Sequence, residues 1–335
     1  MTKTKFDEIE PTGEERLIAR YFQPIATHPG AMALSDDAAY LTPPPGCDIV
    51  LKTDAIVGGI HFRPNDPPGD VARKALRVNL SDLAAKGARP LGFLLSLALP
   101  RDVESGWLAG FAEGLRADAE AFGCPLFGGD TDGTPGPVMI SVAMIGSLPT
   151  GTMVHRAGAS PGDRIFVSGT IGDAALGLAL ASGRGEHWPI DAAARAFLRS
   201  RHHLPRPRTA LAEAIRAHAS ASIDVSDGLI GDVAKLCRVA RVAARVEIEA
   251  VPISDAARAV LASESGVLES LLVGGEDFEI VCTVPPDRGA AFEAAARTAG
   301  VPVREIGRIE AGSGVRFVKR DGEALAVREA SFSHF

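Results

Sequence analysis

Residues 71–100 read VARKALRVNLSDLAAKGARPLGFLLSLALP, and this stretch decides the fold class. Its first part predicts a helix over 71–86, because apolar residues recur there at helical spacing. Its second part predicts a strand over 92–99, since it is a short run of apolar residues, interrupted by Ser96 alone, that Gly and Pro bound. A helix followed directly by a strand indicates a mixed α/β protein rather than an all-α or all-β one.

The same alternation of apolar runs and Ala-rich stretches continues along the chain. Apolar runs of strand length predict strands over 48–54, 92–99, 138–145, 164–167, 245–248, 278–284 and 314–318. Ala-rich stretches between them predict helices over 71–86, 105–122, 172–182, 191–200, 208–217, 229–241, 254–262 and 288–299.

The length of the chain predicts two domains. A chain of 335 residues exceeds what one hydrophobic core normally serves. The segment 149–163 is punctuated by Gly and Pro and lies between two predicted strands, so it is the natural boundary. We therefore expect one domain over 1–148 and a second over 149–335.

Composition excludes several classes of protein. The chain carries 35 Lys and Arg against 42 Asp and Glu, a net charge of −7, which argues against nucleic-acid binding. The four cysteines, at 47, 124, 237 and 282, form no CxxC pair, so we expect neither a zinc site nor a disulfide framework. The polar N-terminus and the short longest apolar run predict a cytoplasmic protein that does not enter a membrane.

Six short acidic clusters lie beside glycines or at the ends of apolar runs. They are Asp36-Asp37, Asp54, Asp82, Asp130, Asp224 with Asp227, and Glu276-Asp277. Each alone is about as consistent with a turn or a helix cap as with a ligand site. Carboxylates repel a phosphate, so a set that binds one needs divalent cations in between, usually Mg²⁺. The whole set therefore predicts an enzyme that uses a magnesium-bound nucleotide.

Glycines accompany three of the candidate sites. Gly128 and Gly129 precede Asp130, and glycines permit unusual backbone angles that expose amides to a phosphate, although a tight turn is the alternative. The segment 168–173, SGTIGD, precedes a predicted helix whose N-terminus could receive an anion. It lacks the lysine of a P-loop and does not match GxGxxG. Around Gly228, the charge of IDVSDGLIGD exceeds what helix capping needs, which favours metal binding.

Taken in order, these motifs resemble the thiamine-monophosphate kinase family. The resemblance extends over 36–335 and rests on SDDAAYL (35–41), KTDAIVGGIHF (52–62), KALRVNLSDLAAKGARP (74–90), GGDT (128–131), RAGASPGD (156–163), GTIGDAALGL (169–178), IDVSDGL (223–229), GGEDFE (274–279) and SFSHF (331–335). It implies the fold of the aminoimidazole ribonucleotide synthetase superfamily: an N-terminal α/β domain that forms a dimer, and a C-terminal α+β domain. The protein is accordingly expected to be a homodimer.

The resemblance also implies an activity and a site. The expected reaction is ATP-dependent phosphorylation of thiamine monophosphate to thiamine diphosphate, with ADP released and several Mg²⁺ ions assisting. Because the acceptor is an ionised phosphate oxygen, direct in-line transfer needs no nucleophilic side chain. The implied metal ligands are Asp36, Thr53, Asp54, Asp82, Asp130, Asp224 and Asp227; the nucleotide contacts are Gly129, Asp130, Arg156 and Ser226; the substrate contacts are His61, Glu276 and Phe332.

Some positions depart from the family pattern, and some alternatives stay open. Lys52 stands where a small or hydroxyl residue often contacts metal, which leaves the number of Mg²⁺ ions open; Ser35 and Ile60 also differ. No cysteine precedes Cys47, which argues against a selenophosphate synthetase, and the His334-Phe335 end argues against the hydrogenase-maturation relative. Aminoimidazole ribonucleotide synthetase and a catalytically silent nucleotide-binding regulator are the remaining alternatives.

Overall fold

The computed structural model describes residues 13–326, which form two compact units. Unit 1 comprises the chain up to Pro44 together with Leu51–Leu76 and Pro90–Ile145. Unit 2 comprises Pro45–Val50, Arg77–Arg89 and the chain from Gly146 onward. No helix among residues 13–326 is both long enough and apolar enough to cross a membrane.

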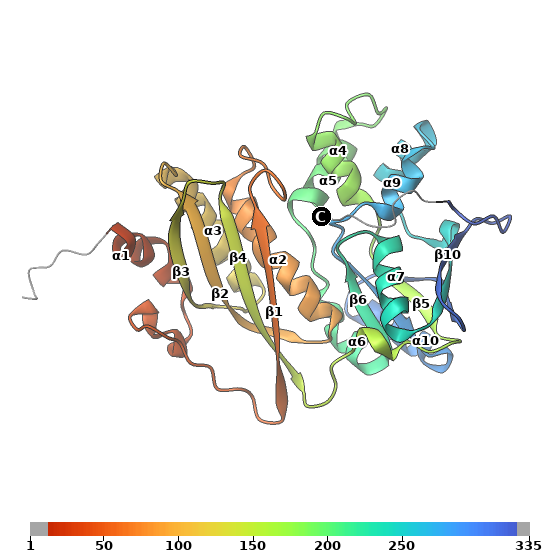
Figure 1. The fold of residues 1–335 in the computed structure, drawn as a ribbon, viewed down its shortest axis with the longest axis horizontal. Helices are drawn as coiled ribbons and strands as arrows, with labels where there is room; N and C mark the ends of the chain where they lie inside the picture. Colours follow the sequence, from red (N-terminus) through yellow and green to blue (C-terminus); the bar gives the residue numbers. More distant parts are fainter. Residues whose placement is uncertain (1–12, 327–335) are drawn as a thin grey trace, which may run out of the picture. The chain divides into compact units, whose positions relative to one another are not determined.

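Unit 1 is built on a four-stranded sheet with the strand order β1-β4-β2-β3. Its strands are β1 (Cys47–Val57), β2 (Arg89–Pro100), β3 (Leu126–Thr134) and β4 (Met139–Pro149). Helices α2 (Pro68–Ala85) and α3 (Ser105–Ala121) lie on the same face of this sheet (Figure 1). Short helical segments precede β1, namely α1 (Gly13–Leu17), η2 (Ile18–Phe22), η3 (Gln23–Ile25) and η4 (Pro29–Leu34).

Helices α2 and α3 cover one face of the sheet of unit 1, and the opposite face carries both apolar and polar exposed side chains (Figure 1). Side chains alternate between the two faces of a strand, and in β2 Leu95 and Leu97 are buried whereas Leu94 is exposed. Leu51 on β1 is 75% exposed, and Met139 on β4 is exposed as well. Unit 1 therefore presents large apolar side chains on the sheet face opposite α2 and α3.

Unit 2 contains a six-stranded sheet with the order β10-β7-β9-β5-β8-β6. Its strands are β5 (Arg164–Ser168), β6 (Ala221–Val225), β7 (Ala243–Glu247), β8 (Glu279–Val284), β9 (Val303–Glu310) and β10 (Gly314–Val318). Its helices are α4 (Asp173–Ala181), α5 (Ala192–His203), α6 (Ala212–His218), α7 (Leu229–Ala240), α8 (Asp255–Ser263), α9 (Val267–Val273) and α10 (Gly289–Thr298).

Both faces of this second sheet are covered. Ile165 and Val167 of β5 join a core cluster that includes residues of α7, whereas Phe166 between them joins a second cluster. In that second cluster Phe166 meets Phe292 of α10 edge to face, with ring centroids 5.3 Å apart. Burial on both faces makes β8 buried at every position, which holds its first residue, Glu279, inside the protein.

The predicted α/β fold is confirmed, and the strands that the sequence missed are informative. Strands β3, β6 and β9 and the short helix α9 were not predicted. The expectation of a glycine loop with unusual angles at Gly128 and Gly129 is wrong, because both lie inside β3 and neither has a positive φ. A Cβ atom at Gly129 would lie 1.8 Å from the Leu95 carbonyl oxygen, so glycine is needed there for strand packing.

Candidate active site

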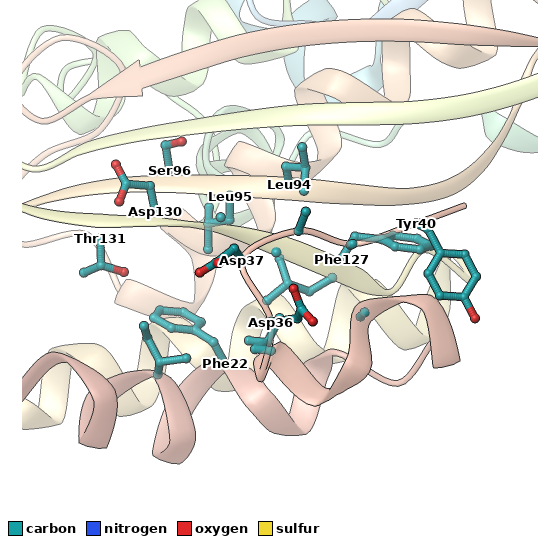
Figure 2. Close-up of a pocket in the computed structure, with 18 of the residues that line it drawn as sticks. Phe22, Asp36, Asp37, Tyr40, Leu94, Leu95, Ser96, Phe127, Asp130 and Thr131 are labelled. Carbon is teal, nitrogen blue, oxygen red and sulfur yellow. The ribbon is translucent and has the colours of Figure 1, made fainter. Parts of the chain in front are cut away.

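A pocket of about 670 Å³ in unit 1 collects three of the predicted carboxylates. It lies between the N-terminal helical segments, the loop that follows η4, and strands β2 and β3. Asp36 and Asp37 come from the loop, and Asp130 comes from β3. Figure 2 shows the loop with Asp36 and Asp37 between the N-terminal helical segment and the strand that carries Asp130.

Strand pairing explains how Asp130 reaches the pocket. Strand β3 runs parallel to β2, and Asp130 is opposite Ser96 in the register. Both residues are exposed and both line the pocket, so they lie on the sheet face opposite α2 and α3. Within residues 13–326, neither Asp130 nor the loop carboxylates Asp36 and Asp37 form an ion pair with a protein cation.

This donor set suits a hard divalent cation. Mg²⁺ takes oxygen ligands and is usually held by one or two carboxylates together with phosphate oxygens and water. Because these carboxylates are not paired with a protein cation, an added cation can bind them. In the described part of the chain no three acidic, His or Cys side chains are close enough to hold a metal by themselves. The residues therefore fit a site that the substrate's own oxygens complete.

The predicted ligands on β1 point to opposite faces of the sheet. Thr53 is exposed, and its Oγ1 lies 3.5 Å from Ser141 Oγ on β4. Asp54 faces the other way, and its Oδ1 lies 3.0 Å from Lys52 Nζ. The structure thus brings a lysine, rather than Thr53, to the Asp54 carboxylate.

His61 lies in the turn that follows β1. Its Nδ1 accepts a hydrogen bond from Val57 N–H at 3.0 Å, which fixes the ring against the end of the strand. Its backbone carbonyl accepts a hydrogen bond from Lys74 Nζ at 2.8 Å. Lys74 is only 3% exposed, so a buried ammonium on α2 holds this turn in place.

Asp82 belongs to the last turns of α2, in the part of that helix that clusters with unit 2. Asn79 and Ser81 beside it are completely buried, whereas Asp82 is partly exposed. Within the motif 74–90, the polar residues Asn79 and Ser81 therefore lie in the interior of the protein, and Asp82 lies at its border.

Four predicted site residues gather at one edge of the sheet in unit 2: Asp224, Ser226, Asp227 and Glu276. Asp224 is the second-last residue of β6, and Ser226 and Asp227 follow the strand directly. Strand β6 is antiparallel to β8 and Val225 pairs with Glu279, so the end of β6 meets the start of β8. Glu276, just before β8, donates its N–H to the Ser226 carbonyl at 2.8 Å.

Two glycines let the backbones approach closely at this edge. A Cβ atom at Gly275 would lie 2.4 Å from the Ser226 carbonyl oxygen. Gly228 has a φ of 107°, and a Cβ atom there would lie 2.3 Å from the Val273 carbonyl oxygen. The segments 226–228 and 273–276 therefore run backbone against backbone, and no larger residue fits at either glycine.

A buried carboxylate supports the turn that carries Ser226 and Asp227. Asp232 is completely buried and accepts their two N–H groups at 3.0 and 2.9 Å. Burial raises the pKa of Asp232, and the Lys235 ammonium 2.8 Å away opposes that shift. Lys235 also forms an ion pair with Asp227, so that predicted metal ligand already carries a protein cation.

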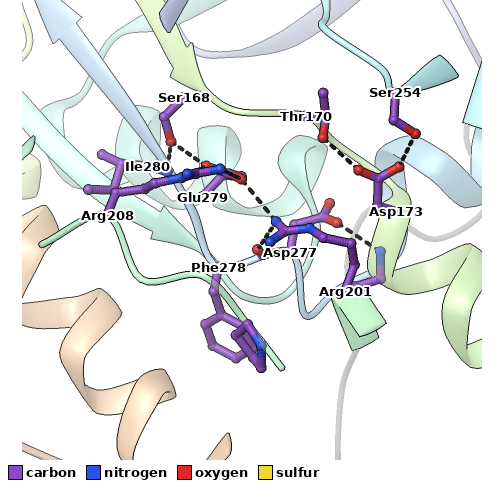
Figure 3. A network of polar contacts seen from close by, with 12 residues as sticks. Ser168, Thr170, Asp173, Arg201, Arg208, Ser254, Asp277, Phe278, Glu279 and Ile280 are labelled. Atoms are coloured by element: carbon purple, nitrogen blue, oxygen red, sulfur yellow. Dashed lines mark hydrogen bonds and ion pairs between the residues drawn. The ribbon is translucent and has the colours of Figure 1, made fainter. Parts of the chain in front are cut away.

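A second polar network fixes the segment that carries Glu276 (Figure 3). Glu279 is completely buried and accepts hydrogen bonds from Arg201 at 3.0 Å, from Arg208 Nε at 2.6 Å and from Ser168 at 2.6 Å. Asp277, also completely buried, accepts the N–H groups of Gly172 and Ala174 at 2.6 and 3.1 Å.

Sequence reasoning missed the residues of this buried polar network. Asp277 and Glu279 lie within the GGEDFE motif, which was the one signal available for them. Arg201 and Arg208 come from more than 70 positions away in sequence, and only the fold brings them to Glu279. Among the other predicted residues, Arg156 is exposed in the short segment η5 (Arg156–Gly158), and Phe332 lies outside the described residues.

Comparison with known proteins places this arrangement in a family. Residues 35–148 match the family model "AIR synthase related protein, N-terminal domain", and residues 160–320 match the corresponding C-terminal domain. The chain is 44% identical over 309 residues to thiamine-monophosphate kinase of Caulobacter vibrioides, covering 91% of this chain and 86% of the relative. The chain belongs to the thiamine-monophosphate kinase family.

Solved structures of thiamine-monophosphate kinases share the fold. The enzyme from Stenotrophomonas maltophilia K279a is 38% identical, with a TM-score of 0.79 over 87% of this chain and 91% of that one. "AaThiL complexed with AMPPCP and TMP" is 32% identical, with a TM-score of 0.77 over 90% of this chain and 91% of that one. The second structure holds an analogue of ATP together with TMP.

Proposed function

We propose that the chain transfers the γ-phosphoryl group of ATP to thiamine monophosphate, giving thiamine diphosphate and ADP. The observation that carries this proposal is the pocket of unit 1, where Asp36, Asp37 and Asp130 gather without a protein cation. Such a site suits a cation-bound polyanion. The relative bound to AMPPCP and TMP supports the choice of both substrates.

The proposed Mg²⁺ ligands are those named in the sequence. Asp36, Thr53, Asp54, Asp82, Asp130, Asp224 and Asp227 would hold several ions between them. Bound there, Mg²⁺ would neutralise the two phosphate groups and stabilise the charge of the transition state. Asp54 and Asp227 each have a lysine at the carboxylate, so cations at these two places compete with protein ammonium groups.

The chain's own residues bind and orient the reactants. Gly129, Asp130, Arg156 and Ser226 are the proposed nucleotide contacts, and His61, Glu276 and Phe332 the proposed substrate contacts. Arg156 is exposed and suited to a phosphate because a guanidinium offers a forked set of donors. Glu276 and Phe332 suit the cationic thiazolium ring, the first by charge and the second by a cation–π contact.

The reaction needs no covalent enzyme intermediate. The acceptor oxygen belongs to an ionised phosphate, so direct in-line attack on the γ-phosphorus is possible without a general base. Burial raises the pKa of Cys124 to about 12 and that of Cys237 to about 11, which keeps both thiols protonated and poorly nucleophilic. Binding and alignment of the two substrates are then the work of the protein.

The assembly is proposed to be a cytoplasmic homodimer. The sheet of unit 1 leaves Leu51 and Met139 exposed on the face opposite α2 and α3. A second copy of the same sheet would bury these side chains, and self-complementary interfaces are the commonest kind between identical chains. We further propose that the functional division follows the expected domains, 1–148 and 149–335.

The test is an ATP-dependent kinase assay of the full chain. Thiamine, thiamine monophosphate and an aminoimidazole ribonucleotide precursor are compared, with Mg²⁺ present or omitted. We expect ADP release only with thiamine monophosphate and Mg²⁺. Turnover of thiamine itself or of the precursor would overturn the substrate assignment, and nucleotide binding without turnover of any acceptor would indicate a silent regulator.

A further inference from the structure

The segment 275–279 of unit 2 holds two non-glycine residues in the left-handed region of backbone space. Glu276 has a φ of 73° and Phe278 a φ of 50°, with Asp277 between them. This conformation is unfavourable for residues with a Cβ atom and persists only where the surroundings impose it. Neighbouring residues must therefore hold Glu276 and Phe278 in this conformation.

Asp277 supplies a constraint from inside the protein. Its Oδ2 accepts Gly172 N–H at 2.6 Å, and its Oδ1 accepts Ala174 N–H at 3.1 Å. Its backbone carbonyl accepts a hydrogen bond from Arg201 at 3.3 Å (Figure 3). Removing a carboxylate from water is costly, and an apolar side chain would fill the same space without that cost. The buried acid therefore calls for a role beyond filling the core.

The backbone on either side of Asp277 is tied to the end of β6. Glu276 donates its N–H to Ser226 at 2.8 Å, and Phe278 donates its N–H to Val225 at 2.9 Å. With both amides fixed and the Asp277 side chain held inside, the two left-handed residues have no room to relax.

This arrangement fixes the position of the Glu276 carboxylate. The Glu276 side chain stays 24% exposed, and its Oε2 lies 2.7 Å from Nδ1 of the buried His202. The two atoms are within ion-pair distance, and the contact is an ion pair only when His202 is protonated. His202 follows Arg201 on α5, so one turn of that helix contacts both the Glu276 side chain and the Asp277 backbone.

We propose that Asp277 is a positioning residue, which imposes the left-handed backbone of Glu276 and so fixes the Glu276 carboxylate for the substrate. The proposal rests on the proposed function only for the role of Glu276 in substrate binding. Asp277 itself is completely buried and acts through its neighbour.

A kinetic double-mutant cycle tests the link between the two residues. At about pH 9, above the Asp277 pKa of about 8, both carboxylate oxygens can accept an N–H group, whereas Asp277→Asn keeps one carbonyl acceptor and turns an NH₂ group toward one of the two donors; KM for thiamine monophosphate measured there should rise about tenfold. In a Glu276→Gln background the same change should alter KM less than about twofold, because the carboxylate it positions is gone. An equal rise in both backgrounds would overturn the proposal.

Asp173→Asn is the matched control. Asp173 is also completely buried at the start of α4 and is bonded to Thr170 and Ser254, but it has no hydrogen bond to the segment 275–279. This variant should lower Tm and leave KM close to the wild-type value. A KM rise equal to that of Asp277→Asn would show that any buried acid in this region has the same effect, which contradicts a positioning role.

A stability cycle needs no substrate and therefore stands if the proposed function fails. Glycine accepts a positive φ, so Glu276→Gly should melt roughly 2 °C above Glu276→Ala, although glycine is ordinarily the less stable of the two. The gain should disappear in the Asp277→Asn background, where the constraint is relaxed. The proposal is overturned if Glu276→Gly melts below Glu276→Ala, or if the gain is unchanged in the Asp277→Asn background. Either result counts whether or not the chain phosphorylates thiamine monophosphate.

Discussion

Asp130 in unit 1 and Glu279 in unit 2 are both carboxylates on strands, yet they differ in burial and in charge pairing. Asp130 is exposed on the wall of a pocket, and within residues 13–326 it has no cationic partner. Glu279 is completely buried between the guanidinium groups of Arg201 and Arg208. The Asp130 carboxylate can therefore bind an added cation, whereas the Glu279 carboxylate is already neutralised by protein guanidinium groups. Acidic residues that look alike in the sequence thus divide into ligands and supports.

Replacing Glu279 should give the largest effect on stability. Glu279→Ala leaves two guanidiniums in the interior without their counter-charge, and we expect a loss of about 3–5 kcal/mol in the free energy of unfolding. Urea denaturation followed by circular dichroism measures it. The exposed Glu120, which pairs with Arg116, is the control, and Glu120→Ala should unfold at the wild-type midpoint. A Glu279→Ala midpoint equal to wild type would remove the distinction between supports and ligands.

Replacing Asp130 should lower activity and leave stability unchanged. Asp130→Ala should lower kcat by at least about a hundredfold, equivalent to roughly 2.7 kcal/mol in the barrier, while Tm stays near the wild-type value. Asp132 is the matched control, since it is exposed two residues along the same strand but does not line the pocket. Steady-state kinetics and thermal melting decide between them. Full activity in Asp130→Ala would refute the ligand role.

Asp277 should make stability depend on pH. Burial raises its pKa to about 8, against the opposing effect of the Gly172 and Ala174 N–H groups. Between about pH 4 and pH 8 the folded protein keeps a proton that the unfolded chain has lost, so this residue's contribution to stability falls as pH rises. The slope is at most about 1.4 kcal/mol per pH unit. Melting curves from about pH 5 to 9 should show a flatter profile for Asp277→Asn, and parallel profiles would contradict the assignment.

An exposed charge should matter least. Arg116 on α3 forms i,i+3 and i,i+4 pairs with Glu113 and Glu120, all at the surface. Solvent screening leaves such pairs little net energy, so Arg116→Ala should not change Tm measurably. A clear drop in Tm would mean that charge pairing, rather than burial, sets the large effect expected at Glu279.

The sequence predicted most of the helices and the apolar strands, because their periodicity is a local property. It missed β6, whose Ser222 and Asp224 interrupt the apolar pattern although the strand is buried throughout. It missed β3 because Gly128 and Gly129 indicate a turn, whereas the parallel partner β2 imposes an extended strand. Tertiary pairing overrode the local preference in both cases.

The candidate site likewise has features that the sequence shows and features that only the fold shows. Acidic residues beside glycine could be found in the sequence, and the structure brings Asp36, Asp37 and Asp130 together in one pocket. What could not be predicted is which carboxylates are already neutralised. Lys235 at Asp227 and the arginines at Glu279 reach their partners only through the fold.

The close approach of the backbones at Gly228 and Gly275 has a consequence for hydrogen exchange. The amide protons of Glu276 and Phe278 are held by carbonyls of 225 and 226, so they can exchange with solvent only when the end of β6 separates from the start of β8. Residues that interrupt regular structure usually exchange quickly. Here they should be protected as long as the strands themselves, which makes this bend one of the last parts of unit 2 to open.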